Sequence, residues 1–289
     1  MTLSDGRRLP VDKIFSMPVG CRDTLMRRLF PIPILFLALY VAGCNLFQKA
    51  EIVRIQNQRS SANKYAAGDW MERRDAVREI VNYLGKEKND LIIGTLMVAA
   101  HDLHTAGRIE AVKGLTKISP ERSIPVIKKM ASEDREGNVR WYALKSLQTF
   151  NDPSTAGIYV KGLESEDWLI REESIRGILA LDEKTIRAGL IPSIIKALND
   201  PSSSVVITAL KSITIKDARL YQVIADKFNS YADHQFSLLE ASLHALEGYR
   251  LDAKTREKVI NLLVHNSNVI RVLALRVLKQ EKKSKVPEK

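Results

Sequence analysis

The fold is decided by a stretch of nine residues, Gly107-Arg108-Ile109-Glu110-Ala111-Val112-Lys113-Gly114-Leu115. The same pattern of small, apolar and polar residues occurs seven times, beginning at residues 72, 107, 139, 170, 205, 238 and 270. Successive copies start 31 to 35 residues apart. An internal period of this length is typical of repeat proteins, whose units bury their apolar faces against one another.

Three positions of the nonamer predict a packed helix. The fifth position is small in every copy: Ala76, Ala111, Ala143, Ser174, Ala209, Ser242 and Ala274. The sixth position is apolar in every copy: Val77, Val112, Leu144, Ile175, Leu210, Leu243 and Leu275. The ninth position is Ile or Leu throughout. Because these positions share one stripe of an α-helix, we expect them to be buried, with the small fifth residue allowing a close helix neighbour.

A second helical segment precedes each nonamer. It is clearest at residues 124–130 and 191–198, where Pro125 and Pro192 are expected in the first turn of a helix. Turn-forming residues such as those at 199–202 separate the two segments. Each unit is therefore predicted to be a helical hairpin. The chain is predicted to be all-α, an α-solenoid of about seven hairpins over residues 50–281.

The repeats resemble HEAT repeats, in particular the HEAT-like, armadillo-type repeats of bacterial proteins, over roughly residues 50–280. The resemblance implies a polar ladder between neighbouring repeats, formed by a turn Asp and by an Arg at the second nonamer position. The Arg residues that fit are Arg73, Arg108, Arg140, Arg171 and Arg271. The Asp residues that fit are Asp69, Asp102, Asp134, Asp167, Asp200 and Asp233. Val206 and Leu239 replace the Arg in copies five and six, where we expect a looser or bent stack.

The seventh nonamer position supplies the candidate binding residues, which we call the basic row: Arg78, Lys113, Lys145, Arg176, Lys211, His244 and Arg276. In HEAT-like stacks the second helices line the concave side. We therefore expect the row to face a groove and to attract a protein segment or an anionic polymer. The alternative is an ordinary solvated face, on which a Glu three or four residues earlier compensates the cation. Such pairs are Glu110 with Lys113, Glu172 with Arg176, and Glu240 with His244.

Aromatic residues lie close to the basic row. Trp141 and Tyr142 occupy the third and fourth positions of the third nonamer, and Trp141 precedes Lys145 by one helical turn. An aromatic ring beside a cation is a candidate contact for a peptide or a sugar. The alternative is that Trp70 and Trp168 fill the turns between helices and that only Trp141 is partly exposed.

The N-terminal segment predicts the location of the protein. An apolar run after Arg27 and Arg28 is too short to cross a bilayer, which takes about 20 residues. A basic segment followed by a short apolar run and then by small residues is typical of a secretory signal peptide. Residues 41–44, Val-Ala-Gly-Cys, resemble the lipobox of bacterial lipoprotein precursors. The resemblance implies lipidation of Cys44 and cleavage before it, which leaves a protein anchored to a membrane without spanning it.

These motifs set the expected boundaries. Residues 1–43 are assigned to the signal peptide, and residues 44–49 to the lipidated tether. Met26 directly before the basic pair is an alternative start, which would make residues 1–25 a mis-assigned start. Residues 282–289 are basic and predicted to be disordered. Asn45 follows the lipidated residue in place of the Asp typical of inner-membrane retention in enteric lipoproteins, which favours the outer membrane facing the periplasm.

The composition excludes several classes of function. The chain has 289 residues, a net charge of +11 and two Cys, and loss of residues 1–43 removes Cys21 and leaves a net charge of +8. Lipidation of Cys44 would leave no thiol for a disulfide, a nucleophile or a zinc site. His101 and His104 lack a third ligand, so no metal site is expected. The sequence also lacks phosphate-loop, dinucleotide, zinc-protease and nucleophile-elbow motifs, so no catalytic residue and no cofactor are predicted.

The sequence therefore predicts a non-enzymatic lipoprotein of the bacterial cell envelope that binds a protein or an anionic envelope polymer. The alternative is an enzyme or nucleic-acid-binding protein on a HEAT-like scaffold, similar to the phycobilin lyases or the alkylpurine DNA glycosylases. That alternative requires that the lipobox is not used, because export separates the protein from DNA, and no nucleic acid partner is otherwise expected. The identity of the partner and the oligomeric state stay open.

Overall fold

The computed structural model describes residues 56–57, 59–66, 68–84 and 90–281. The signal peptide, the lipobox with Cys44, the tether and the C-terminal tail all lie outside the described residues. The chain divides into two compact units, Met1–Ser60 and Ser61–Lys289, and the repeats belong to the second. The described part of the chain consists of helices and connecting turns and contains no strand.

The second unit is a row of helical hairpins, which confirms the predicted all-α solenoid. Each nonamer lies in the second helix of a hairpin. These second helices are α4 (Trp70–Tyr83), α6 (Thr105–Leu115), α8 (Gly137–Leu147), α10 (Trp168–Ala180), α13 (Ser203–Ser212), α15 (Phe236–Leu246) and α17 (Asn268–Glu281). The first helices from the second hairpin onward are α5 (Asp90–Ala99), α7 (Pro120–Glu133), α9 (Ala156–Gly162), α12 (Ile191–Leu198), α14 (Ala218–Ser230) and α16 (Ala253–Asn261). A short helix, α11 (Glu183–Thr185), and a π-helical turn, Ile186–Leu190, lead into α12.

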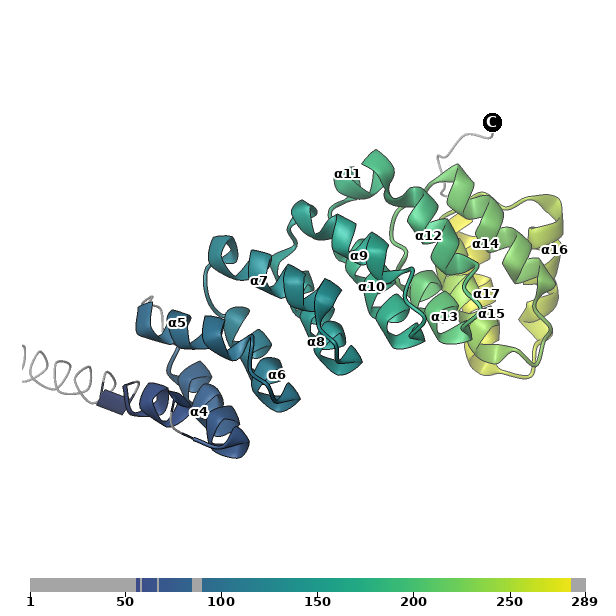
Figure 1. Ribbon diagram of the computed structural model, residues 1–289. Coiled ribbons are helices and arrows are strands. Elements are labelled where there is room, and N and C mark those ends of the chain that lie inside the picture. Colours follow the sequence, from purple (N-terminus) through teal and green to yellow (C-terminus); the bar gives the residue numbers. More distant parts are fainter. Residues whose placement is uncertain (1–55, 58, 67, 85–89, 282–289) are drawn as a thin grey trace, which may run out of the picture. The chain divides into compact units, whose positions relative to one another are not determined.

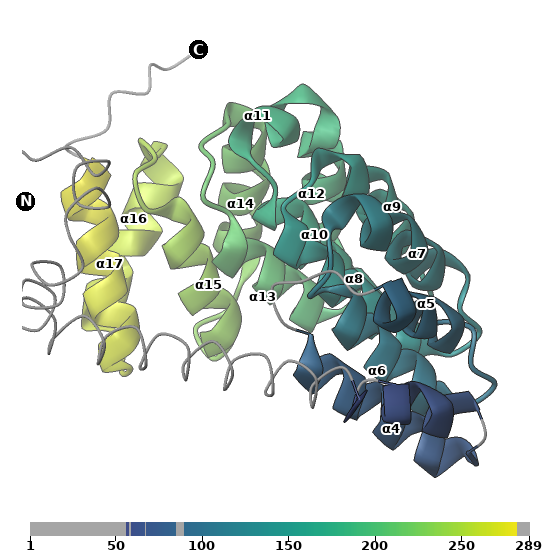
Figure 2. The same ribbon diagram turned by 90° about the vertical axis from the view of Figure 1, so that its left-hand side faces the viewer.

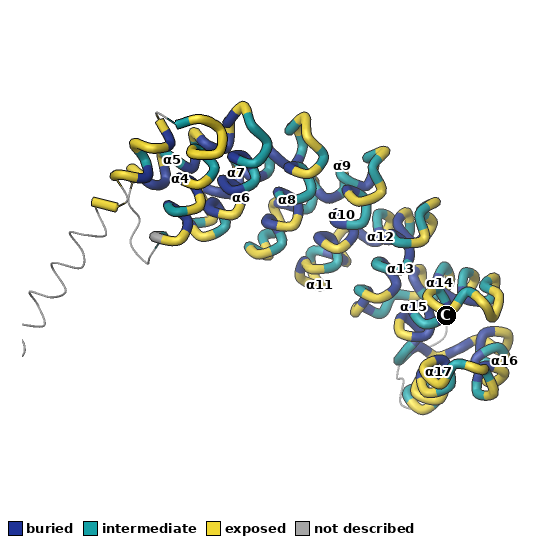
Figure 3. The backbone as a smooth tube through the Cα atoms, turned by 90° about the horizontal axis from the view of Figure 1, so that it is seen from below, coloured by how far each residue is buried: buried dark blue, intermediate teal, exposed yellow. Residues whose placement is uncertain are grey.

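Helices of the same kind pack side by side along the second unit. Each second helix contacts the next, from α4 against α6 to α15 against α17, and from α6 onward each also packs against the first helix of its own hairpin. Figure 1 shows α4, α6, α8 and α10 following one another, with α5, α7 and α9 along the other side. Figure 2 shows the same two layers from the side. The core therefore runs between the layers, where Figure 3 shows the buried parts of the backbone.

The nonamer positions that were predicted to be buried form this core. All seven residues at the fifth position are at most 1% exposed. At the sixth position the prediction is wrong for Leu275, which is 45% exposed although Leu210 and Leu243 are buried. Within the described part of the chain, α17 packs on α15 and α16 and has no further second helix beyond it. Its outer side, with Val272 and Leu275, therefore stays in solvent.

Local capping explains where several helices begin. The side chain of Asp69 accepts hydrogen bonds from the N–H groups of Met71 and Glu72, and the N–H of Asp69 donates to the carboxylate of Glu72, which is a capping box at the start of α4. Pro192 lies in the first turn of α12, as predicted. The expectation for Pro125 is wrong, because α7 begins five residues earlier at Pro120. Pro125 lies inside α7, where it cannot donate to the preceding turn.

The implied Arg–Asp ladder is present at three steps of the stack. Arg73 binds both carboxylate oxygens of Asp102 at 2.8 and 3.1 Å. The pairs Arg108–Asp134 and Arg171–Asp200 repeat the arrangement at 2.7 to 2.9 Å. Each pair connects the second helix of one hairpin to the turn of the next. The bidentate geometry therefore fixes the register between neighbouring repeats.

Three of the remaining candidates play other roles. Asp69 and Asp167 are N-caps of α4 and α10 and do not pair with a ladder Arg. Arg140 binds the backbone oxygens of Asp134 and Arg135 instead. These residues cap turns within their own hairpins.

The ladder stops where the Arg is missing, but the helix packing continues. Val206 and Leu239 are buried at the two positions that lack Arg. The helix α13 packs against α15 over as broad a surface as it packs against α10. The looser stack expected at copies five and six is therefore not found between α13 and α15, since apolar contacts replace the ion pairs there. The other alternative, a bent stack, stays a prediction. No helix in the part of the chain that the structure describes is long and apolar enough to cross a bilayer.

Candidate functional site

The structure brings the whole basic row to the surface of the second helices. One residue of the row lies on each of α4, α6, α8, α10, α13, α15 and α17, and all seven side chains are exposed. The helices follow one another in the stack, so the cations form a continuous series along what we call the second-helix face. Helical spacing explains the alignment, because the row lies two residues after the buried fifth position in every copy.

Carboxylates alternate with the cations along this face. Arg78 binds Glu110 of the next hairpin at 3.1 Å, and Lys113 binds the same carboxylate at 3.0 Å. Farther along, Arg176 binds Glu172 at 2.6 Å. The face is therefore not uniformly positive, and its charges are arranged as neighbouring opposite pairs.

The same alternation continues to the C-terminal end of the row. Lys211 binds Glu240 of the next hairpin at 3.3 Å. His244 and Arg276 lie on either side of Glu247, at 3.4 and 3.3 Å. Two of the three local pairs expected from the sequence are confirmed, and the expected pair of Glu240 with His244 is wrong. The pairs between hairpins join residues 29 or 32 positions apart, so a search within one helix does not find them.

The centre of the row has aromatic rings in place of carboxylates. Tyr142 occupies the nonamer position that is Glu110 in the preceding copy, and the Nζ of Lys113 lies 5.4 Å from the centre of the Tyr142 ring. The Nζ of Lys145 lies 4.9 Å from the centre of the Trp141 ring. The two rings meet edge to face with centroids 4.9 Å apart. We call Trp141, Tyr142 and Lys145 the aromatic centre.

Lys145 differs from the rest of the row in its partners. Among the described residues, it is the row cation with no carboxylate within 4.0 Å. The charge of Lys145 acts on Glu173, a buried residue of α10. Burial raises the pKa of Glu173, although the hydrogen bond from Gln148 and the charges of Arg176 and Lys145 oppose the rise. The ammonium of Lys145 is therefore held by an aromatic face and is available to a partner.

The structure corrects the expectation for the other two Trp residues. Trp70 and Trp168 are the first residues of α4 and α10, and they are 39% and 43% exposed. They therefore do not fill the turns, whereas Trp141 and Tyr142 are half-buried and packed against the core. Trp70 stacks on the ring of His104 at 4.1 Å between centroids.

The two neighbouring His residues are part of a helix start. His104 is the N-cap of α6, and its Nδ1 accepts the N–H of Ala106 at 3.3 Å. His101 is exposed in the preceding turn. No group of three metal-ligating side chains is present among the described residues.

No motif in the sequence indicates the cavities of the surface. A cavity of about 670 Å³ lies between the α14–α15 turn and α16. A second, of about 530 Å³, lies between the α5–α6 turn and α7 and is lined by Leu103 and Lys129. Both lie at the edge of the stack formed by the turns within hairpins, away from the basic row. Their positions depend on contacts between hairpins, which no single motif shows.

Comparison with known proteins identifies the architecture. Residues 93–176, from α5 to α10, match the family model for HEAT repeats. YibA of Escherichia coli superposes with a TM-score of 0.56 at 13% identity, covering 82% of this chain and 97% of that protein. The fold is a HEAT-like α-solenoid.

Two further structures support the same assignment of the HEAT-like solenoid. An archaeal HEAT-like repeats protein from Thermococcus onnurineus NA1 superposes with a TM-score of 0.51 at 18% identity, covering 80% of this chain and 97% of that one. An engineered protein superposes with a TM-score of 0.52 at 15% identity, covering 78% of this chain and 68% of that one. No curated protein matches the sequence. At these identities the likeness shows the fold alone.

Proposed function

We propose that this chain is a non-enzymatic scaffold, anchored to the bacterial envelope through a lipid on Cys44, which binds a protein segment along its second-helix face. The observation that carries the proposal is the basic row itself. Seven hairpins place six cations and His244 on one exposed face, and carboxylates alternate with them. A HEAT-like solenoid offers such a face to an extended partner because its units repeat in one direction.

The alternating charges favour a protein over an anionic polymer. A uniformly negative polymer would meet Glu110, Glu172 and Glu240 along the same track as the cations. A polypeptide carries side chains of both signs and can match such a pattern residue by residue. Electrostatic matching of this kind sets the register and the choice of partner more than the affinity.

The aromatic centre is the expected point of strongest contact. Binding energy at protein interfaces concentrates in Trp, Tyr and Arg residues near the middle of the contact surface. Trp141 and Tyr142 lie on α8, the third of the seven second helices, and Lys145 above the Trp141 ring has no competing ion pair among the described residues. A partner side chain can therefore bind Lys145 without first breaking a salt bridge.

The proposed location depends on the sequence. A basic segment, a short apolar run and the lipobox-like residues 41–44 support lipid anchoring, and the preference for the outer membrane depends on Asn45. We also propose that the chain has no catalytic activity, because its sequence has none of the motifs expected of a hydrolase, a nucleotide-dependent enzyme or a zinc enzyme.

The binding surface is tested by capture of partners from solubilised envelopes. We expect a specific partner on the wild-type chain and its loss on a Trp141→Ala/Lys145→Glu variant. The matched control is Trp168→Ala/Lys184→Glu, which changes the same residue types at exposed positions off the basic row. Lys145→Glu alone removes no packed side chain and should still weaken binding. If the wild type, the Trp141→Ala/Lys145→Glu variant and the Lys145→Glu variant all captured the same amount of partner, the proposed surface would be contradicted.

The anchor is tested by labelling cells with radioactive palmitate. The wild-type chain should be labelled and should fractionate with membranes, whereas Cys44→Ala should be unlabelled. An unlabelled wild-type chain in the cytosol would refute the anchor and restore the enzyme and nucleic-acid alternatives.

A further inference from the structure

The Arg–Asp ladder has one turn at which an Asp is present and its Arg is absent. Asp102, Asp134 and Asp200 each stand five residues before a nonamer, and each binds the guanidinium of the preceding hairpin through both oxygens. Asp233 stands five residues before the sixth nonamer, in the same register. The preceding hairpin carries Val206 where the other steps carry Arg.

The same turn also lacks the second Arg contact of the repeat. In four hairpins the Arg of the second helix donates to the two backbone oxygens of its own turn, as Arg108 does to Asp102 and Leu103. Arg140 donates in the same way to Asp134 and Arg135. Arg171 and Arg271 do the same in their hairpins. In the sixth hairpin this position is Leu239. The turn at Asp233 and His234 therefore has neither an ion pair from the Arg of the preceding hairpin nor hydrogen bonds from an Arg of its own helix.

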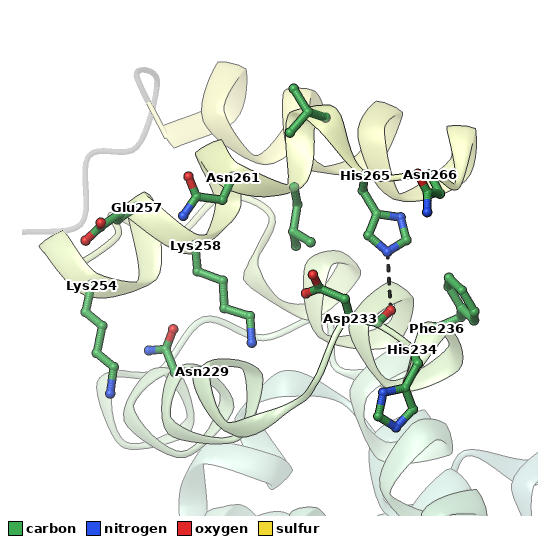
Figure 4. A pocket seen from close by; sticks show the side chains of 12 residues that line it. Asn229, Asp233, His234, Phe236, Lys254, Glu257, Lys258, Asn261, His265 and Asn266 are labelled. Atoms are coloured by element: carbon green, nitrogen blue, oxygen red, sulfur yellow. Dashed lines mark hydrogen bonds between the residues drawn. The ribbon is translucent and has the colours of Figure 1, made fainter.

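The missing Arg changes the position of the carboxylate. The side chains of Asp102, Asp134 and Asp200 are 2%, 7% and 7% exposed, whereas Asp233 is exposed. Figure 4 shows the Asp233 carboxylate directed toward the space between the α14–α15 turn and α16. That space is the cavity of about 670 Å³. The Asp233 carboxylate thus faces an accessible cavity and is not buried between repeats.

One cation of the cavity is already engaged by backbone oxygens. The Nζ of Lys258 donates to the backbone oxygens of Phe228 and Tyr231 at the C-terminal end of α14. Desolvation lowers the pKa of Lys258, and the nearby charge of Asp233 opposes that fall. Among the described residues the Asp233 carboxylate has no ion pair within 4.0 Å, so a further cation can bind it without breaking one.

The other walls suit a planar cation. Phe236 is 51% exposed at the rim of the cavity and lies edge to face with His265. The Nδ1 of His265 accepts the N–H of Ser267 at 3.0 Å, so its Nε2 can donate to the backbone oxygen of Asp233 at 3.2 Å. A guanidinium bonds a carboxylate through two N–H groups and stacks on aromatic rings, which an ammonium does less well.

We propose that this cavity binds the guanidinium of an arginine from a partner protein. That guanidinium would pair with Asp233 in place of the ladder Arg, which is Val206 in this chain. The carboxylate accepts the two N–H groups, and the exposed ring of Phe236 lies at the rim of the same cavity. The site lies at the turn edge of the stack. It is therefore separate from the basic row, and either proposal can fail without the other.

The test is a titration of the full chain with N-acetyl-arginine N-methylamide, followed by NMR of His residues labelled at Cε1. We expect saturable shifts of His234 and His265 with a Kd of roughly 1 mM, which corresponds to about 4 kcal/mol. His101, in the turn at the other cavity, should not shift. The citrulline analogue has the same shape without the charge and should bind at least about tenfold more weakly.

A variant pair assigns the site. Asp233→Asn should weaken the arginine probe about tenfold, because it removes a charge-assisted bidentate acceptor. Asp226→Asn on α14 is the matched control, since Asp226 is exposed and bonds Gln222 outside the cavity. Equal binding by Asp233→Asn and wild type, equal shifts with the citrulline analogue, or equal shifts at His101 would each overturn the proposal.

Discussion

The protonation of Asp200 connects the ladder to the acid stability of the protein. Burial alone would raise the pKa of this carboxyl, but hydrogen bonds from Arg171 and from the N–H of Ser202 outweigh burial and hold the pKa below its ordinary value of 3.8. A pKa that is lower in the folded than in the unfolded chain stabilises the fold above the unfolded value. That contribution is lost as the pH falls from about 3.8 through the lower folded value.

We predict that Asp200→Asn lowers the free energy of unfolding at pH 7 by roughly 2 kcal/mol, because Arg171 loses a charged, bidentate partner in a largely buried place. Urea unfolding at several pH values measures this change. The difference between wild type and variant should shrink as the pH falls below 3.8. Asp226→Asn is the control and should stay within about 0.5 kcal/mol of wild type. A difference that is independent of pH would show that the ion pair is not its source.

At the scale of the helix, a missing side chain lets α9 lie close to α10. A Cβ at Gly177 would lie 2.2 Å from the Cε1 of Tyr159, a fully buried residue of α9. The hydroxyl of Tyr159 donates to the backbone oxygen of Leu144 at 3.4 Å, so the ring has little room to move. Gly94 in α5 is the opposite case, because a Cβ there would have no neighbour within 4 Å.

We predict opposite effects of Ala at these two glycines. Gly177→Ala should destabilise the fold by about 1–3 kcal/mol through overpacking. Gly94→Ala should stabilise it by about 0.5–1 kcal/mol, because Ala has the higher helix propensity and restricts the unfolded chain. Thermal and urea unfolding of both variants measure the two changes. Stabilisation by Gly177→Ala would refute the close contact of α9 with α10.

The sequence was sufficient to predict the elements, because their pattern is local. Small residues at the fifth nonamer position lie on one helix stripe and are all buried in the structure. The start of α7 was predicted wrongly from Pro125, since the pattern of the first helices is weaker and Pro120 supplies another start. The Arg–Asp ladder was expected from the family resemblance, and three of its steps are present as ion pairs.

The surroundings of the candidate site could be predicted only in part. The exposure of the basic row follows from helical spacing, but the pairing of Arg78 with Glu110 joins residues 32 positions apart. Such pairs depend on the register between hairpins. The exposure of Asp233 was also not predictable, because it depends on which residue the preceding hairpin places opposite it.

At the scale of the whole molecule, the proposed binding surface is one face of the stack. The second helices bring the basic row and the aromatic centre together, and the turn edge carries a separate cavity. The ladder and the core fix the hairpins against one another, so the side chains of the face are held at a constant spacing. A partner that follows this spacing contacts several hairpins at once.

Crosslinking in living cells tests the central claim most directly. A photoreactive residue at Arg176 on α10, next to the aromatic centre in the stack, should give a discrete adduct with one partner protein. That adduct should disappear when Trp141→Ala and Lys145→Glu are added, and the same photoreactive residue at Lys184 on α11 should not give it. The absence of an adduct from position 176, or the same adduct from both positions, would contradict the account.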